Sequence, residues 1–249
     1  AGTGNANFGY FYGGYPAFTN VERIDYSNDT ATATVVTTFS TSNKNRAGAT
    51  GSASFGYFAG GFMNSYSTQS SSNSRIDFSN DTATLSVRGA LYSNEHQECD
   101  GESSQTHGYI IGGSMDPSIA PSSPDPRKRS TISRIDFAND TATATRVGNF
   151  WYGQYTIGIR ATGNNDFAYF IGSNPSSNVS RLDYSNDNAG TIERGNITYT
   201  DVYQGAAAGN LNFGYFTKYT RVERIDYSND LAASVLSLIH ISEPTRPRI

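Results

Sequence analysis

The hydrophobic and polar positions of the chain follow the periodicity of short β-strands. The segment FGYFAGG from Phe55 is an aromatic and apolar run that ends in glycines, a pattern typical of a buried strand. The segment RIDF from Arg75 alternates polar and apolar residues and predicts a strand with two unlike faces. The letters SND that follow predict a tight turn, because Asn and Asp tolerate left-handed backbone. The Thr/Ala run after the turn predicts a return strand.

This block of segments occurs five times along the chain. Its second position is occupied by Ile24, Ile76, Ile135, Leu182 and Ile225, at spacings of 52, 59, 47 and 43 residues. Small residues precede each aromatic strand, as in GAAAG from Gly205, and they suit a strand crowded against its neighbours at a central axis. Four antiparallel strands repeated about every 50 residues predict the blades of a β-propeller.

The predicted fold class is therefore all-β, with about five four-stranded blades visible as part of a larger propeller. The propeller domain is expected over residues 1–235, with blades at 1–36, 45–87, 97–147, 157–194 and 203–235. The last residues, Leu236–Ile249, share no letters with the repeat and resemble a translated sequencing adapter, so a non-native tail is expected there; a natural tail is the alternative. The missing initiator Met favours a fragment.

The units resemble kelch repeats, in which an aromatic strand ending in Gly-Gly precedes a Tyr-Asp strand. In one unit the likeness is carried by Tyr57, Phe58, Gly60, Gly61, Asp77 and Phe78. The kelch tryptophan of the last strand is replaced by Thr or Ala, and Gly-Gly is lost at 172–173 and 217–218. The repeat sequence, FGYFAGG followed by RIDFSNDTATLSVRG, also resembles kelch-like repeat proteins of marine bacteriophages. That resemblance implies a virion or tail-appendage component, located on a virion or outside the cell.

Composition and charge argue against nucleic-acid binding, a membrane span and a metal site. The net charge of −4 argues against a nucleic-acid surface, and no run of about 18 apolar residues predicts a membrane span. The only metal-like cluster surrounds His96 and Cys99, and one His with one Cys does not make a zinc site, so neither metal nor cofactor is expected. Repeated pairs such as Arg23 and Asp25 favour an ion pair between blades, because a catalytic pair is needed only once.

Candidate ligand-binding residues gather where loop length varies. The second loop of each blade and the connection to the next blade share one rim, and the span from Ile110 to Ile135 is 25 residues against 9 from Phe216 to Ile225. Exposed aromatic rings beside Asn, Asp and Ser suit sugars, which present apolar faces ringed by hydroxyls. The candidates are Tyr15, Phe18, Tyr66, Tyr92, Trp151, Tyr152, Tyr155 and Tyr199. The alternative is that these rings fill gaps between blades.

Three functions are compatible with this pattern. The first is a non-enzymatic binding or structural propeller on a phage virion or tail appendage, in contact with a host-surface glycan or another virion protein. The second is a secreted or cell-surface bacterial adhesion module of the same fold. The third is a glycan-cleaving propeller, which requires an unrepeated pair of carboxylates in a pocket. The sequence indicates no catalytic residue.

Overall fold

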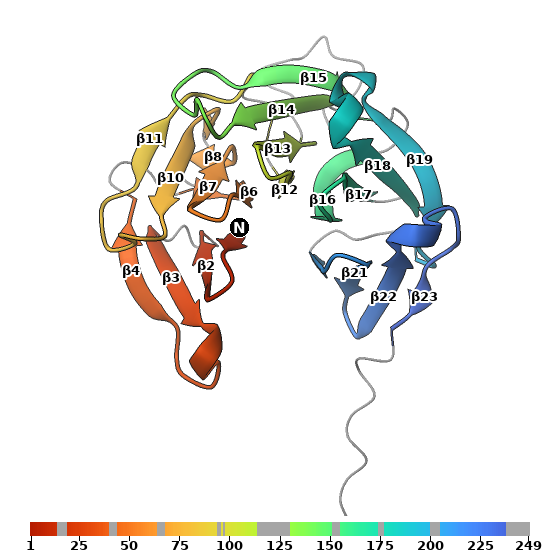
Figure 1. Cartoon of the computed structure of the whole chain (residues 1–249), viewed down its shortest axis with the longest axis horizontal. Helices are drawn as coiled ribbons and strands as arrows, with labels where there is room; N and C mark the ends of the chain where they lie inside the picture. The colour runs from red at the N-terminus through yellow and green to blue at the C-terminus, as the bar shows by residue number, and fades with distance from the viewer. Residues whose placement is uncertain are drawn as a thin grey trace, which may run out of the picture.

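The chain folds as five four-stranded antiparallel sheets set around a central axis (Figure 1). This arrangement is seen in a computed structural model that describes residues 1–13, 19–39, 44–63, 68–93, 96, 98–113, 130–150, 155–173, 177–199 and 205–237. The prediction of an all-β propeller is confirmed. Within these ranges, no helix has the length and apolar character needed to span a membrane.

Each blade is a meander that runs from the axis outward in chain order. The blades consist of β1 (Gly2–Gly4), β2 (Phe8–Tyr12), β3 (Asn20–Asp25) and β4 (Thr34–Thr38); β6 (Gly48–Gly51), β7 (Phe55–Ala59), β10 (Asn73–Asp77) and β11 (Ser86–Arg88); β12 (Asp100–Ser103), β13 (His107–Ile111), β14 (Thr131–Asp136) and β15 (Thr145–Asn149); β16 (Tyr155–Gly163), β17 (Phe167–Ser173), β18 (Asn178–Asp183) and β19 (Thr191–Asn196); and β20 (Ala206–Gly209), β21 (Phe213–Lys218), β22 (Arg221–Asp226) and β23 (Val235–Leu236).

A small extra sheet accompanies the second blade and was not predicted. It contains β5 (Lys44–Asn45), β8 (Phe62–Met63) and β9 (Thr68–Gln69). The Gly-Gly pair between β7 and β8 has φ of 71° at Gly60 and 83° at Gly61, which explains why glycine is required at this bend. The fourth and fifth blades lack the pair, and their second strands are longer, with seven residues in β17 and six in β21.

The turn after each third strand is fixed by the aspartate that ends the strand. Asp25 Oδ1 accepts hydrogen bonds from the Ser27 backbone N–H at 2.9 Å and from the Ser27 hydroxyl at 2.7 Å. These bonds hold the pKa of Asp25 below its usual value. The same capping recurs in the other blades. In three of the five blades the turn is a 3-10 helix: η1 (Tyr26–Asn28) in the first, η2 (Tyr184–Ala189) in the fourth and η3 (Tyr227–Asn229) in the fifth. We call the rim that carries these turns the turn rim, and the opposite one the loop rim.

The apolar core lies between blades rather than within them. Four clusters of buried side chains occupy the four junctions between successive blades. At the first junction Tyr12 stacks on Phe39 of its own blade and contacts Phe58 of the second. Because each sheet buries its faces only against its neighbours, the blades depend on one another for stability.

Candidate functional site

The same hydrogen-bonded group, which we call the Tyr–Arg–Asp clamp, connects each blade to the next. Tyr10 on β2 lies directly across from Arg23 on β3, so both side chains leave the sheet on one face. Both reach Asp81 in the turn of the second blade. Phe78 of that turn stacks on the Tyr10 ring, with 4.9 Å between ring centroids. One clamp therefore joins a tyrosine, an arginine and an aromatic–aspartate turn.

The clamp repeats at all four junctions with nearly constant geometry. The distances from tyrosine hydroxyl to Asp Oδ2 are 2.8 Å for Tyr10–Asp81, 2.9 Å for Tyr57–Asp140, 3.0 Å for Tyr109–Asp187 and 3.1 Å for Tyr169–Asp230, and those from Arg Nη1 are 2.7 Å for Arg23–Asp81, 2.7 Å for Arg75–Asp140, 2.8 Å for Arg134–Asp187 and 2.7 Å for Arg181–Asp230. Burial, and then the neighbouring aspartate, raises the pKa of each clamp tyrosine well above its usual value.

The clamp confirms that the repeated charges form ion pairs between blades, and it corrects the partner. The sequence pairs Arg23 with Asp25 two residues later, but Asp25 caps its own turn. The acid that meets the arginine is the turn aspartate of the following blade, Asp81. Sequence spacing alone does not reveal this pairing because it depends on how two blades pack.

The five innermost strands face a common space at the axis, which we call the channel. Residues of β1, β6, β12, β16 and β20 line a cavity of ≈ 910 Å³. Most of the lining side chains are small, as predicted for strands that crowd an axis; β20 contributes Ala206, Ala207, Ala208 and Gly209. Against this background the charged side chains of the lining are conspicuous. Glu98 is paired with Arg46, which leaves Asp100, Glu102 and Arg160.

Glu102 replaces a threonine of the repeat. Thr50 lies across from the clamp tyrosine Tyr57, and Glu102 lies across from Tyr109 in the same register. The threonine normally donates to the next blade, and the Thr50 hydroxyl donates to the Glu102 backbone oxygen at 2.8 Å. The half-buried Glu102 carboxylate instead accepts the Ser103 N–H at 2.9 Å. Burial raises the pKa of Glu102 to about 7.

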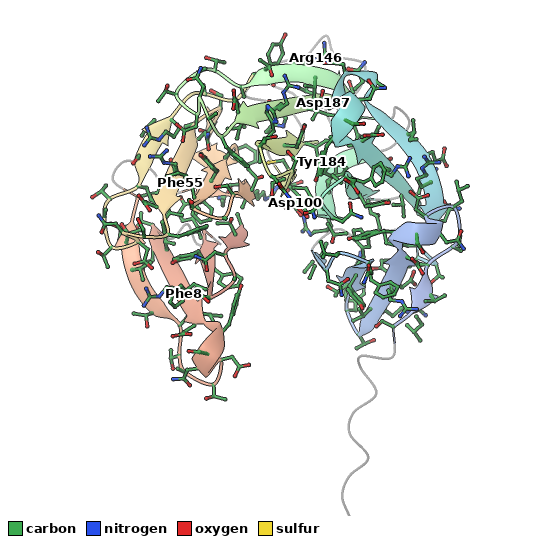
Figure 2. All side chains as sticks on the ribbon, viewed as in Figure 1. Phe8, Phe55, Asp100, Arg146, Tyr184 and Asp187 are labelled. Atoms are coloured by element: carbon green, nitrogen blue, oxygen red, sulfur yellow. The ribbon has the colours of Figure 1, made fainter. Side chains whose placement is uncertain are left out.

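Asp100 lies two residues before Glu102 on the same face of β12. Its Oδ2 accepts the Ala161 N–H of the fourth blade at 3.0 Å, and its Oδ1 accepts the Gly101 N–H at 2.9 Å. Burial raises the pKa of Asp100, and Arg160 partly offsets this rise. Figure 2 shows Asp100 at the inner edge of the arc, with Tyr184 and Asp187 farther out. The two carboxylates form an unrepeated pair beside the channel, with Cα atoms ~6.6 Å apart by strand geometry.

The predicted ligand-binding aromatics are only partly within the described residues. Tyr92 lies in the connection between β11 and β12 and is 53% exposed. Tyr199 is half-buried and packs against the core cluster between the fourth and fifth blades, and burial raises its pKa to about 12. Tyr155 begins β16, but its side chain lies outside the description. The other candidates, Tyr15, Phe18, Tyr66, Trp151 and Tyr152, also lie outside it.

Sequence reasoning missed one exposed aromatic residue on the loop rim. Tyr219 forms the turn between β21 and β22, is 94% exposed and has φ of 54°. The Lys218 ammonium lies 5.0 Å from the centre of its ring. The second loop of the fifth blade is short, and the candidates were predicted where loops are long. The signal in the sequence is a tyrosine at the position where the first three units have the second glycine of Gly-Gly.

Both ring nitrogens of His96 are hydrogen-bonded to other groups of the protein. His96 is fully buried, with Nδ1 2.9 Å from the Gly112 carbonyl oxygen and Nε2 2.8 Å from the Ser133 hydroxyl. The Cys99 thiol contacts the His96 carbonyl oxygen, and burial raises its pKa to about 12. The described part of the chain contains no group of three His, Cys, Asp or Glu side chains able to hold a metal ion.

Comparisons with known proteins do not assign the chain to a family. No protein-family model matches it, and no curated protein matches it. The fold and the geometry above are therefore the basis for its function.

Proposed function

We propose that the chain is a non-enzymatic binding propeller that recognises its ligand on the loop rim. The observation that carries this proposal is the contrast between the two kinds of side chain. The repeated Tyr, Arg and Asp residues are engaged between blades, whereas Tyr92 and Tyr219 present their rings to solvent on the loop rim. A stable scaffold with exposed aromatics on variable loops is the usual form of a recognition surface.

The backbone beneath Tyr92 is held in place. Leu91 is buried, and its N–H donates to the Ser71 carbonyl oxygen at 2.7 Å. The Tyr92 N–H donates to the Ser133 hydroxyl at 3.2 Å. A ring on an anchored backbone loses little conformational entropy when a ligand stacks on it, which favours binding.

The ligand class that best fits these rings is a carbohydrate. A tyrosine ring offers an apolar face for a sugar ring and a hydroxyl for hydrogen bonds. The likeness of the repeats to kelch-like proteins of marine phages supports a place on a virion or tail appendage, with a host-surface glycan as ligand and another virion protein as the alternative partner. A bacterial adhesion module uses the same surface, and the genes beside the natural gene distinguish the two settings.

A glycan array probed with the full chain tests this proposal. We expect binding to at least one glycan, with affinity reduced about tenfold or more by Tyr92→Ala or Tyr219→Ala, since a stacked ring contributes on the order of 1–2 kcal/mol. The matched control is Leu231→Ala, because Leu231 is 69% exposed, between the values for Tyr92 and Tyr219, but lies on the turn rim. Absence of binding to every glycan, or equal effects of all three substitutions, contradicts the proposal.

A glycan-cleaving activity is the second candidate, and the Asp100–Glu102 pair favours it. The two carboxylates are unrepeated, line the channel, and include one group with a pKa of about 7, as a general acid requires. Release of reducing ends from a bound glycan, abolished by Glu102→Gln with binding retained, would establish this activity. Binding without any release of reducing ends supports the non-enzymatic proposal.

A further inference from the structure

The first and last blades each have one face that no other blade covers. Figure 1 shows the arc open between the sheet of β2–β4 and the sheet of β21–β23. The four junctions inside the arc bury the equivalent faces of all other blades. The residues on the two open faces can therefore be compared with their buried counterparts, position by position.

The open face of the fifth blade carries the Tyr–Arg half of a clamp. Tyr215 lies directly across from Arg224, as in every other unit. The Arg224 guanidinium stacks on Phe213, 4.4 Å from its ring centre, as Arg23, Arg75 and Arg181 stack on theirs. Within the described residues, neither Tyr215 nor Arg224 reaches a carboxylate. The four other clamp tyrosines are at most 1% exposed, whereas Tyr215 is partly exposed.

The open face of the first blade carries the matching half. Asp29 occupies the position of the clamp aspartates, yet it is exposed. Tyr26, at the position of the stacked turn aromatics, is 53% exposed. Phe11 is 50% exposed, whereas its counterparts in the other four units, Phe58, Ile110, Phe170 and Phe216, are completely buried against the preceding blade.

We propose that the two open faces carry the two complementary halves of the blade interface, and that each binds a further four-stranded blade of this repeat. The fifth blade requires a partner with an aromatic–aspartate turn, and the first requires a partner with a Tyr–Arg pair. A single unit of this repeat carries one set on each side. Charge complementarity supports this occupant, because Arg224 meets an aspartate and Asp29 meets an arginine. Continuity with four existing junctions supports it as well.

The face of the fifth blade is tested by adding a blade after it. In the extended chain, residues 237–249 are replaced by a second copy of residues 197–236, which brings its own turn aspartate. We expect Tyr215→Phe to leave the melting temperature of the parent chain unchanged and to lower that of the extended chain by about 2–4 °C. Asp230→Asn in the added copy alone should have a similar effect. The double variant should fall short of the sum, because the two groups interact directly.

The face of the first blade is tested by adding a blade before it. A copy of residues 155–205 is placed ahead of Ala1, so that the copied Tyr169 and Arg181 face Asp29. Asp29→Asn should leave the melting temperature of the parent chain unchanged and should lower that of this extended chain. Asp140→Asn, which removes an existing clamp, should lower the melting temperature of both and shows that the assay detects a broken clamp.

Three results overturn the proposal. The first is a substitution at Tyr215 or Asp29 that leaves the melting temperature of its extended chain unchanged. The second is an added unit that melts in a separate transition and leaves the parent transition unchanged. The third is an added unit whose amides gain no protection from hydrogen exchange, because the copied sequence folds against the same clamp in the parent and should fold against it again.

Discussion

Replacing Glu102 by threonine should stabilise the protein at neutral pH and remove part of its pH dependence. Threonine is the residue that the repeat places across from the clamp tyrosine, as Thr50 and Thr162 show. Burial raises the pKa of Glu102 from 4.5 to about 7, so the folded state binds this proton more tightly than the unfolded state does. The stability gained from the proton is fully present below pH 4.5 and is lost as pH rises to 7.

The size of this effect follows from the pKa difference. A rise from 4.5 to about 7 corresponds to a maximum loss of about 3.4 kcal/mol between acidic and neutral pH. Because the side chain is half-buried and water reaches it through the channel, we expect about 1–3 kcal/mol. Glu102→Thr avoids this loss and restores a hydroxyl that can donate to the neighbouring blade.

Urea unfolding at pH 5 and pH 8 measures the difference. The stability advantage of Glu102→Thr over the natural chain should be larger at pH 8 than at pH 5 by about 1–3 kcal/mol. Glu102→Gln, which keeps the size of the side chain but cannot ionise, should show the same widening. Asp100 is present in all three proteins, and its charge contributes to the raised pKa of Glu102, so both substitutions remove that contribution alike. Equal differences at the two pH values would refute the argument.

Three further changes test the scaffold. Asp140→Asn removes the acid of one clamp and should reduce the free energy of unfolding by about 3 kcal/mol in chemical denaturation, because its two partner arginines, Arg75 and Arg88, lose their counter-ion. Gly89→Ala places a Cβ 1.8 Å from the Ala142 carbonyl oxygen and should cost about 1–3 kcal/mol, whereas Gly2→Ala, with no atom closer than 3.4 Å, should change stability little. Cys99 should resist a thiol reagent in the folded protein and react fully in urea, since burial raises its pKa to about 12; rapid modification without denaturant would contradict its position in the core.

The sequence predicts the propeller because its strongest signals are local. Each unit contains an aromatic strand, an alternating strand and an Asx turn, and each of these is determined by residues a few positions apart. Repetition then converts one blade into a radial array. The small residues of the innermost strands are predictable for the same reason, since most positions of these strands are small in each unit, with Asp100, Glu102 and Arg160 as the charged exceptions.

The contacts between blades were not predictable in this way. Arg23 is close in sequence to both Asp25 and Asp29, yet it pairs with Asp81 of the next unit. Position within the repeat is a local property, but the choice of partner depends on the offset between neighbouring sheets. The extra sheet of β5, β8 and β9 depends likewise on where the second loop of one blade meets the connection from the previous one.

Comparison of the units with one another would have identified the channel carboxylates. Aligned on the clamp tyrosine, the innermost strands read Thr3, Thr50, Glu102, Thr162 and Ala208, and only the third unit places an acid there. The signal is thus an exception within the repeat.

A residue that breaks a repeat and lowers stability is a stronger indication of function than a residue that every unit keeps. The repeated clamp acids stabilise the junctions, so their presence needs no further explanation. Glu102 is expected to destabilise the fold at neutral pH, because burial raises its pKa to about 7. Across its junction the Tyr184 hydroxyl is buried without a hydrogen-bond partner among the described residues. The corresponding Tyr227 hydroxyl lies 2.9 Å from that of Thr162. Functional sites are where proteins depart from the locally favoured residue. If Glu102→Thr raises stability and leaves glycan binding and any hydrolysis unchanged, the loop rim alone carries the function; if it raises stability and abolishes either one, the channel is part of the site.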